Sequence, residues 1–247
     1  MSKKVTFNDS YGPCILSPKV ASQLLRAIIG TQGAADLPLL YKTAVSYLEI
    51  PKMQVELNVT DFAYEAFGKR CRVPIHADDQ DVLARDVVLV KDGKTFEYMT
   101  NIESAAALQL PLTGNGRFDG SKTEVHIRNF AVHPGTDTFE EQIASINDGF
   151  YLVDAFQWDY TPKDEYAMRI KKAYHIDHGK LGVELAPHVI YGYGSDLLRR
   201  ITKVGDDFKW YTDDFTKQRG IKAYIGAPHI KSIMNIGFDP FGRLGYR

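Results

Sequence analysis

The segment from residue 17 to residue 31 constrains the fold most, because it has every feature of a buried amphipathic helix. Ser17 can cap a first turn, and Pro18 suits the first helical position. Apolar residues then recur at helical spacing, namely Val20, Ala21, Leu24, Leu25, Ile28 and Ile29. The pattern predicts a helix over residues 18–30 that ends at Gly30.

Most of the remaining chain has the alternation and turn residues of β-strands. The predicted strands cover residues 53–59, 85–90, 95–99, 125–130, 150–156, 165–176, 181–185 and 223–238, the last range holding two strands. Asp92 and Gly93 suit a tight hairpin turn, and residues 177–180 predict another.

Two further helices are predicted between these strands. Thr138 and Glu141 form a capping-box pair for a short helix that ends by Gly149. Ser195 caps a second helix that runs through Val204. We therefore expect an α+β fold with a largely antiparallel sheet and about three helices. No linker composition interrupts the chain, so residues 1–247 are predicted to form a single domain.

Charge and cysteine content narrow the possible functions. The chain has 30 Lys and Arg against 31 Asp and Glu, which disfavours nucleic-acid and anionic-membrane binders. No apolar stretch resembles a signal peptide or a membrane span, so we expect a cytoplasmic location. Cys14 and Cys71 have no metal or redox spacing, which suits buried thiols in a reducing compartment.

Several segments resemble, in order along the chain, those of the TldD/PmbA metalloprotease family. They are the helix segment 13–31, Thr-Gly-Asn-Gly-Arg at 113–117, the strand and Pro-Gly turn at 128–135, Asp-Gly and its strand at 148–153, and residues 226–230. The resemblance covers nearly the whole chain. It implies the C-terminal portion of that family, without the family's N-terminal domain.

In that family the helix carries His-Glu-x-x-x-His, and the corresponding positions here are Arg26, Ala27 and Thr31. Protonated arginine has no lone pair for a metal ion, and Ala27 cannot act as a general base. The family's later cysteine ligand is missing too, because no cysteine follows Cys71. Residues five apart on an ideal helix are separated by about 140°, so two ligands there would require a bend, which Gly30 could permit.

The resemblance therefore implies a non-catalytic, TldE-like subunit of a heteromeric zinc metallopeptidase. Family members commonly pair one zinc-bearing subunit with one that lacks zinc. We expect no catalytic residue, metal or other cofactor in this chain. Zinc is expected in a homologous, TldD-like partner with an intact His-Glu-x-x-x-His motif. The implied substrates are small or unfolded peptides or precursor peptides, which this chain would hold as an added strand.

Candidate peptide-binding residues are Arg26, Gln32, Asn115, Arg117 and His229. The planar fork of Arg26 suits a peptide carboxylate, although arginine beside an apolar stripe is more often solvated. Asn115 and Arg117 lie in a glycine-rich loop whose backbone could approach a ligand, although a bare turn has the same signature.

Other functions remain open from the sequence. Cys71 with a nearby histidine could carry out acyl transfer if a base generates the thiolate. A non-enzymatic, peptide-binding homodimer is a third possibility. His126, His133 and His229 are the alternative metal donors, but the first two lie about 23 Å apart along an extended chain unless it folds back.

Overall fold

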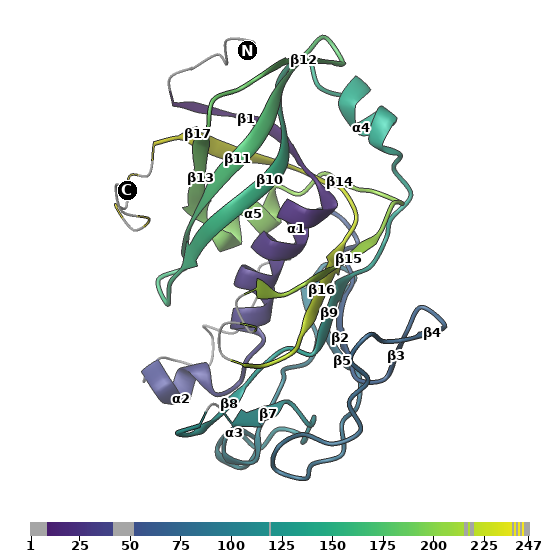
Figure 1. Cartoon of the computed structure of the whole chain (residues 1–247), viewed down its shortest axis with the longest axis vertical. Coiled ribbons are helices and arrows are strands. Elements are labelled where there is room, and N and C mark those ends of the chain that lie inside the picture. The colour runs from purple at the N-terminus through teal and green to yellow at the C-terminus, as the bar shows by residue number, and fades with distance from the viewer. Residues whose placement is uncertain are drawn as a thin grey trace.

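Two β-sheets and a central helix make up the body of the protein (Figure 1). The computed structural model describes residues 9–41, 52–118, 120–214, 217, 220–238, 240, 242 and 244. Helix α1 (Pro18–Leu25) lies between the sheets and contacts β10 (Asp148–Tyr160) of one and β16 (Tyr224–Ala227) of the other.

The first sheet closes on itself. Its other strands are β1 (Ser10–Leu16), β11 (Glu165–Asp177), β12 (Lys180–Glu184), β13 (His188–Tyr193), β14 (Lys203–Val204) and β17 (Ile230–Gly237). Strand β1 pairs in parallel with β10 and antiparallel with β17, while β11 and β13 connect β10 to β17 on the other side. These strands form a ring, from which β12 extends beside β11 and β14 beside β17.

The second sheet has the strand order β15-β16-β9-β2-β5-β6. Its strands besides β16 are β2 (Val59–Phe62), β5 (Val87–Lys91), β6 (Lys94–Thr95), β9 (Asn129–Val132) and β15 (Lys209–Thr212). Two short ribbons lie apart from it, one formed by β3 (Glu65–Ala66) and β4 (Lys69–Arg70), the other by β7 (Gly116–Phe118) and β8 (Thr123–Val125).

The long predicted helix is present, but its last turn is a π-helix. The Ser17 side chain caps α1 by accepting a bond from the Val20 amide, and η1 (Arg26–Gly30) continues it. The other helices are α2 (Leu37–Tyr41), α3 (Ile102–Leu108), α4 (Phe139–Ala144) and α5 (Gly194–Arg199). No helix in this described part of the chain is long and apolar enough to cross a bilayer.

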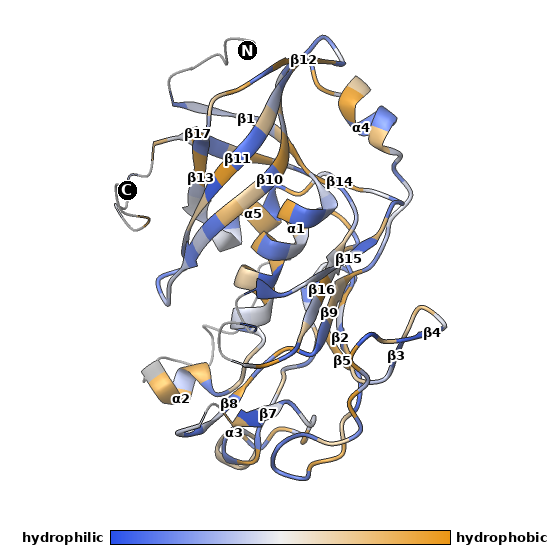
Figure 2. Ribbon diagram, viewed as in Figure 1, coloured by the Kyte–Doolittle hydropathy of each residue, from blue (hydrophilic) through white to orange (hydrophobic). Residues whose placement is uncertain are grey.

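The core follows from the alternation of apolar and polar residues along α1 and the strands (Figure 2). Leu24, Leu25 and Ile28 are fully or almost fully buried and belong to one large apolar cluster that draws residues from both sheets. Burying a large aliphatic side chain stabilises a fold by about 1.5–3 kcal/mol. The central helix is therefore the main link between the sheets.

The α+β fold class is confirmed, as are the predicted hairpins. Asp92 and Gly93 both have positive φ, and so do His178 and Gly179, as two-residue hairpin turns require. The closing strands of the chain are β16 and β17. The sheets are mixed and not purely antiparallel, because β1 pairs in parallel with β10 and β9 with β16.

Several predicted boundaries are wrong. Of the strand predicted at 53–59 only Val59 joins a strand, and the preceding residues are irregular. The strand predicted at 125–130 is divided between β8 and β9. The helix expected through Val204 ends at Arg199, because Val204 instead pairs with Ile230 of β17. Helix α3 was not predicted, although Asn101 and Ser104 form its capping box.

Candidate functional site

The π-helical turn brings residues 26 and 31 to one side of the central helix. A π-helix bonds residue i to residue i+5, so residue 31 lies about one turn beyond residue 26. Arg26 and Thr31 accordingly line the same cavity. The sequence predicted a bend at Gly30, and the structure achieves the same alignment by widening the turn.

Gly30 allows the π-helical turn to pack closely against Ile127. A Cβ atom added at Gly30 would lie 3.3 Å from Cγ2 of Ile127, closer than most side-chain contacts. The helix end therefore rests directly against the segment that precedes β9. This contact gives Gly30 a packing role that does not depend on metal binding.

The cavity beside η1, called here the helix cleft, has a volume of about 350 Å³. Its walls come from η1, residues 34–40, residues 124–127 and residues 158–160 at the end of β10. Elements that are far apart in the chain therefore meet beside the motif positions Arg26 and Thr31.

Arg26 is buried in the wall of the helix cleft, so the expectation of a solvated side chain is wrong. Its side chain is 7% exposed, and its Nε lies 3.2 Å from Oδ2 of Asp213, which is 4% exposed. The guanidinium carbon lies 5.5 Å from the centre of the Trp158 ring. Arg26 is therefore held by an internal carboxylate and an aromatic face.

Carboxylates dominate the rest of the cleft. Asp36, Glu124 and Asp159 all line it, together with His126. Burial raises the pKa of Asp36 to about 6, even though Asp36 accepts a hydrogen bond of 2.8 Å from the Val125 amide. Nε2 of His126 lies 3.6 Å from Oε2 of Glu124. Such a wall suits an ammonium or guanidinium group of a ligand.

The motif positions do not fit zinc. Arg26 and Ala27 have no donor atom for a cation, and Thr31 offers only a neutral hydroxyl. In the described ranges no group of three or more His, Cys, Asp or Glu side chains could hold a metal ion. The motif positions therefore lack the donor chemistry that a zinc site requires.

The histidines suggested as alternative donors do not converge. His126 lines the helix cleft, but His133 lies beside β2, where its Nε2 is 2.9 Å from the Thr60 hydroxyl. Nδ1 of His229 lies 2.7 Å from Oδ2 of Asp207, and its Nε2 lies 3.0 Å from the Tyr151 hydroxyl. The joint site is therefore not formed.

The side chains of Asp207, His229 and Tyr151 contact one another in the order acid, base and hydroxyl, as in a catalytic triad. The protonation state of Tyr151 nevertheless favours a structural role. Burial is the main cause that raises the pKa of Tyr151 to about 12, so the phenol stays protonated at neutral pH. Burial also lowers the pKa of His229, whose ring stacks on Phe139 at 4.3 Å. His229 thus ties β10, α4 and β17 together.

The other candidate peptide-binding residues lie outside the cleft. Gln32 donates to Asp164 at 3.4 Å. Arg117 forms an ion pair with Asp79 at 3.0 Å. Asn115 is fully buried and donates to the His126 carbonyl at 2.9 Å, so it supports the cleft wall from behind. Of the motif positions and peptide-binding candidates among the described residues, only Arg26 and Thr31 line the cleft, together with His126 from the alternative metal donors.

A buried ion pair that was not predicted from the sequence supports the same wall of the helix cleft. Nε of Arg128 lies 2.8 Å from Oδ2 of Asp61, and both side chains are almost completely buried. Oδ1 of Asp61 accepts the amides of Arg128 and Asn129 at 2.7 and 3.1 Å. Asn115 donates to Oδ2 of Asp61 at 2.8 Å. The network fixes the start of β9 relative to β2.

Cys71 is poorly suited to catalysis. It packs in an apolar cluster with Phe62, Ala66 and Ala131. Burial, reinforced by Asp86 and Asp61, raises its pKa to about 11. Within the described residues its sulfur has no hydrogen bond to a histidine that could remove the proton. These features disfavour the acyl-transfer hypothesis.

The sequence is similar to known metalloproteases. It is 27% identical over 227 residues to a zinc metalloprotease TldD homolog of Saccharolobus solfataricus, a match that covers 89% of this chain and 49% of that protein. It is 28% identical over 203 residues to a metalloprotease of Methanocaldococcus jannaschii, a match that covers 79% of this chain and 43% of that protein. The chain thus spans about half the length of these relatives.

The fold is similar to a solved structure as well. The crystal structure of TldE from Thermococcus kodakarensis matches with a TM-score of 0.77 and 19% identity, over 95% of this chain and 52% of that chain. The family profile described as the PmbA/TldA metallopeptidase C-terminal domain matches residues 9–236. The chain therefore belongs to the PmbA/TldA (TldD/PmbA) metallopeptidase family, as a C-terminal domain.

Proposed function

We propose that this chain is a non-catalytic, TldE-like subunit of a two-component zinc metallopeptidase. The observation that supports the proposal is the buried Arg26–Asp213 ion pair, because Arg26 stands at the position where the resemblance expects the first histidine of the motif. Ala27 and Thr31 complete a motif without zinc donors. The fold similarity to a TldE structure is consistent with this assignment.

Zinc and the general base would then come from a homologous, TldD-like subunit. A partner with the intact His-Glu-x-x-x-His motif supplies Lewis-acid chemistry on the peptide carbonyl. This chain contributes the wall of a shared chamber and orients the substrate. The substrates are small or unfolded peptides or precursor peptides.

The helix cleft supports peptide binding in two ways. Its carboxylates Asp36, Glu124 and Asp159 suit a peptide ammonium or a basic side chain. Strand β15 is the outer strand of the second sheet as described, and it runs directly into Asp213 beside Arg26. An extended peptide added to this edge would be held by backbone hydrogen bonds.

The test is to purify this chain alone, and then together with a TldD-like protein of the same organism that carries the intact motif. Zinc is measured by mass spectrometry, assembly by native mass, and hydrolysis with an unfolded peptide. We expect no stoichiometric zinc or hydrolysis from this chain alone. The two proteins should co-purify, with zinc in the TldD-like protein and hydrolysis by the complex.

A matched control replaces the motif glutamate of the TldD-like protein by glutamine, which should keep assembly and abolish hydrolysis. Stoichiometric zinc with hydrolysis by this chain alone would overturn the proposal. A homodimer that never binds the second protein would favour the scaffold function instead. Loss of hydrolysis in a Cys71→Ser variant of the isolated chain would favour acyl transfer.

A further inference from the structure

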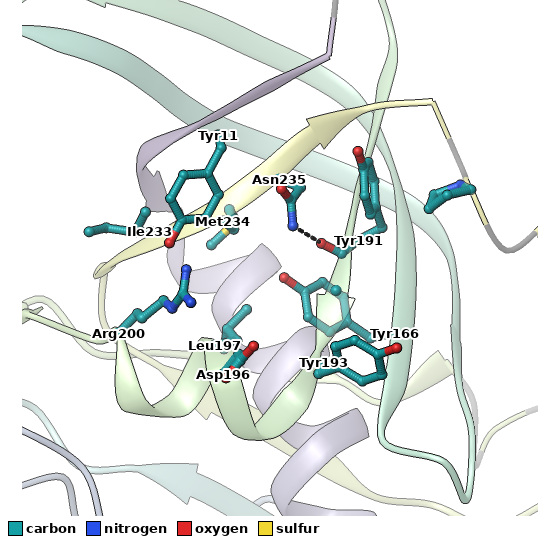
Figure 3. Close-up of a pocket in the computed structure, with 12 residues that line it drawn as sticks. Tyr11, Tyr166, Tyr191, Tyr193, Asp196, Leu197, Arg200, Ile233, Met234 and Asn235 are labelled. Carbon is teal, nitrogen blue, oxygen red and sulfur yellow. Dashed lines mark hydrogen bonds between the residues drawn. The ribbon is translucent and has the colours of Figure 1, made fainter.

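A second cavity, separate from the helix cleft, lies between the ring of strands and α5 (Figure 3). Its volume is about 460 Å³, which is within the range of small-molecule sites. Its walls come from β1, β11, β13, α5 and β17, and tyrosines dominate its lining. We call it the tyrosine pocket. It shares no lining residue with the helix cleft.

The hydroxyl of a buried tyrosine points into the tyrosine pocket. The Tyr166 side chain is 2% exposed, and its hydroxyl has no hydrogen-bond partner among the described residues. Figure 3 shows this hydroxyl aimed at the middle of the cavity. Burial and the nearby charge of Asp196 keep the phenol protonated by raising its pKa. Such a donor is normally satisfied in the native state, here by whatever enters the pocket.

Gly192 keeps the space beside this hydroxyl open. A Cβ atom at that position would lie 3.4 Å from the Tyr166 oxygen, and the φ of 155° also favours glycine. Strand β13 therefore has no side chain at the point where a ligand would approach the Tyr166 hydroxyl.

Opposite charges face the same cavity from α5. The Arg200 guanidinium lies 5.1 Å above the Tyr11 ring, and no carboxylate of the described chain forms an ion pair with it. Asp196 lines the pocket one helical turn earlier, and it forms an exposed ion pair of 3.7 Å with Arg199. A carboxylate and a guanidinium that line one cavity can hold the two charges of a zwitterion.

The floor of the pocket is apolar. Leu197 and Met234 are each 2% exposed and line it from α5 and β17. The ring of Tyr11 stands beside Arg200 at the rim (Figure 3). Aromatic groups bury well against such surfaces and stack on tyrosine. The lining thus combines a zwitterion site with an aromatic site.

We propose that the tyrosine pocket binds a free α-amino acid with an aromatic side chain. Its carboxylate is held by the Arg200 guanidinium and the Tyr166 hydroxyl, and its ammonium group by Asp196. Its ring lies against Leu197 and Met234. The assignment does not depend on the proposed peptidase function, because the binding site is complete in this chain.

The first test titrates the full chain with L-phenylalanine by calorimetry. Phenylalaninamide lacks the carboxylate, and N-acetylphenylalanine lacks the ammonium charge. We expect saturable binding of phenylalanine at one site, and binding of each analogue at least about tenfold weaker. Absence of saturable binding up to about 10 mM, or equal binding of the amide, would overturn the proposal. Equal binding of the acetylated form would assign the pocket to a peptide C-terminus instead.

The second test uses variants that keep the fold. Tyr166→Phe removes only the hydroxyl, and Arg200→Gln removes the guanidinium charge. Arg70→Gln makes the same charge change on β4, outside the pocket. We expect the first two variants to bind phenylalanine at least about tenfold more weakly and the third to bind it normally. Unchanged binding in Tyr166→Phe and Arg200→Gln, with unchanged thermal stability, would refute the assignment.

Discussion

The Arg26 guanidinium lies 3.2 Å from the Asp213 carboxylate, and the two side chains are 7% and 4% exposed. An ion pair this deeply buried has lost most of its hydration, so each charge depends on the other. The pair joins the central helix to the segment after β15. It therefore stabilises the wall of the helix cleft at the π-helical turn.

Breaking this pair should destabilise the protein strongly. Arg26→Met or Asp213→Asn leaves one buried group without its partner, and we expect a loss of about 3–5 kcal/mol in the free energy of unfolding. Removing both charges, as Arg26→Met with Asp213→Leu, should recover much of that loss. Urea unfolding measures all three variants.

The partly exposed pair of Lys19 and Asp154 provides the matched control. Lys19→Met should change the stability by less than about 1 kcal/mol. Equal effects of Lys19→Met and Arg26→Met would contradict the role given to burial.

Two histidines placed at positions 26 and 31 should create a metal site, because the π-helical turn aligns these positions. We expect Arg26→His with Thr31→His to bind Co²⁺ at least about tenfold more tightly than either single variant. Visible absorption of Co²⁺ reports the binding.

The control moves the second histidine by one residue, as Arg26→His with Gln32→His. The Gln32 side chain bonds Asp164 and does not line the helix cleft, so this variant should not gain affinity. The same affinity in both double variants would show that the turn does not set the alignment.

Asp36 should make stability depend on pH. Burial raises its pKa from the ordinary 3.8 to about 6 in the folded protein, so the folded state holds the proton more tightly. The stabilising contribution of the protonated carboxyl is complete below about pH 4 and is lost as pH rises through about 6. As the pH rises from 4 to 7.5, the free energy of unfolding of Asp36→Asn should increase by about 2–3 kcal/mol relative to that of the native protein.

Urea unfolding of both proteins across that pH range tests this prediction, because contributions from other carboxyl groups cancel in the difference. A difference that does not vary with pH would mean that burial does not raise the pKa of Asp36.

Gly149 should be essential for closing the first sheet. A Cβ atom there would lie 2.4 Å from the Pro13 carbonyl oxygen, which is backbone and cannot move aside. We expect Gly149→Ala to destabilise the protein by about 1–3 kcal/mol. Gly12→Ala is the control on the adjoining strand, because a Cβ atom there would meet nothing within 4 Å. Equal melting temperatures of the two variants would contradict the role given to Gly149.

The sequence predicts features that depend on nearby residues. Ser17 and the apolar spacing locate α1, and Asp92 with Gly93 locates a hairpin turn, because capping and turn geometry are local. The helix expected through Val204 fails for the opposite reason. Pairing of that residue with Ile230 is a tertiary interaction, and it overrides the helical pattern.

The site could be predicted only in part. The missing donors at Arg26, Ala27 and Thr31 follow from the family resemblance, and the structure brings the first and last of these to one cleft. The partner of Arg26 could not be predicted, because Asp213 lies far along the chain and periodicity carries no information about such contacts.

The double pairing of β1 has a consequence for the order of folding. Cys14 lies opposite Phe150 on one side and Ser232 on the other, so the first strand receives its neighbours from the middle and the end of the chain. Contacts of such long sequence separation impose a high contact order and slow folding. During synthesis, the ring cannot form until the ribosome has released β17.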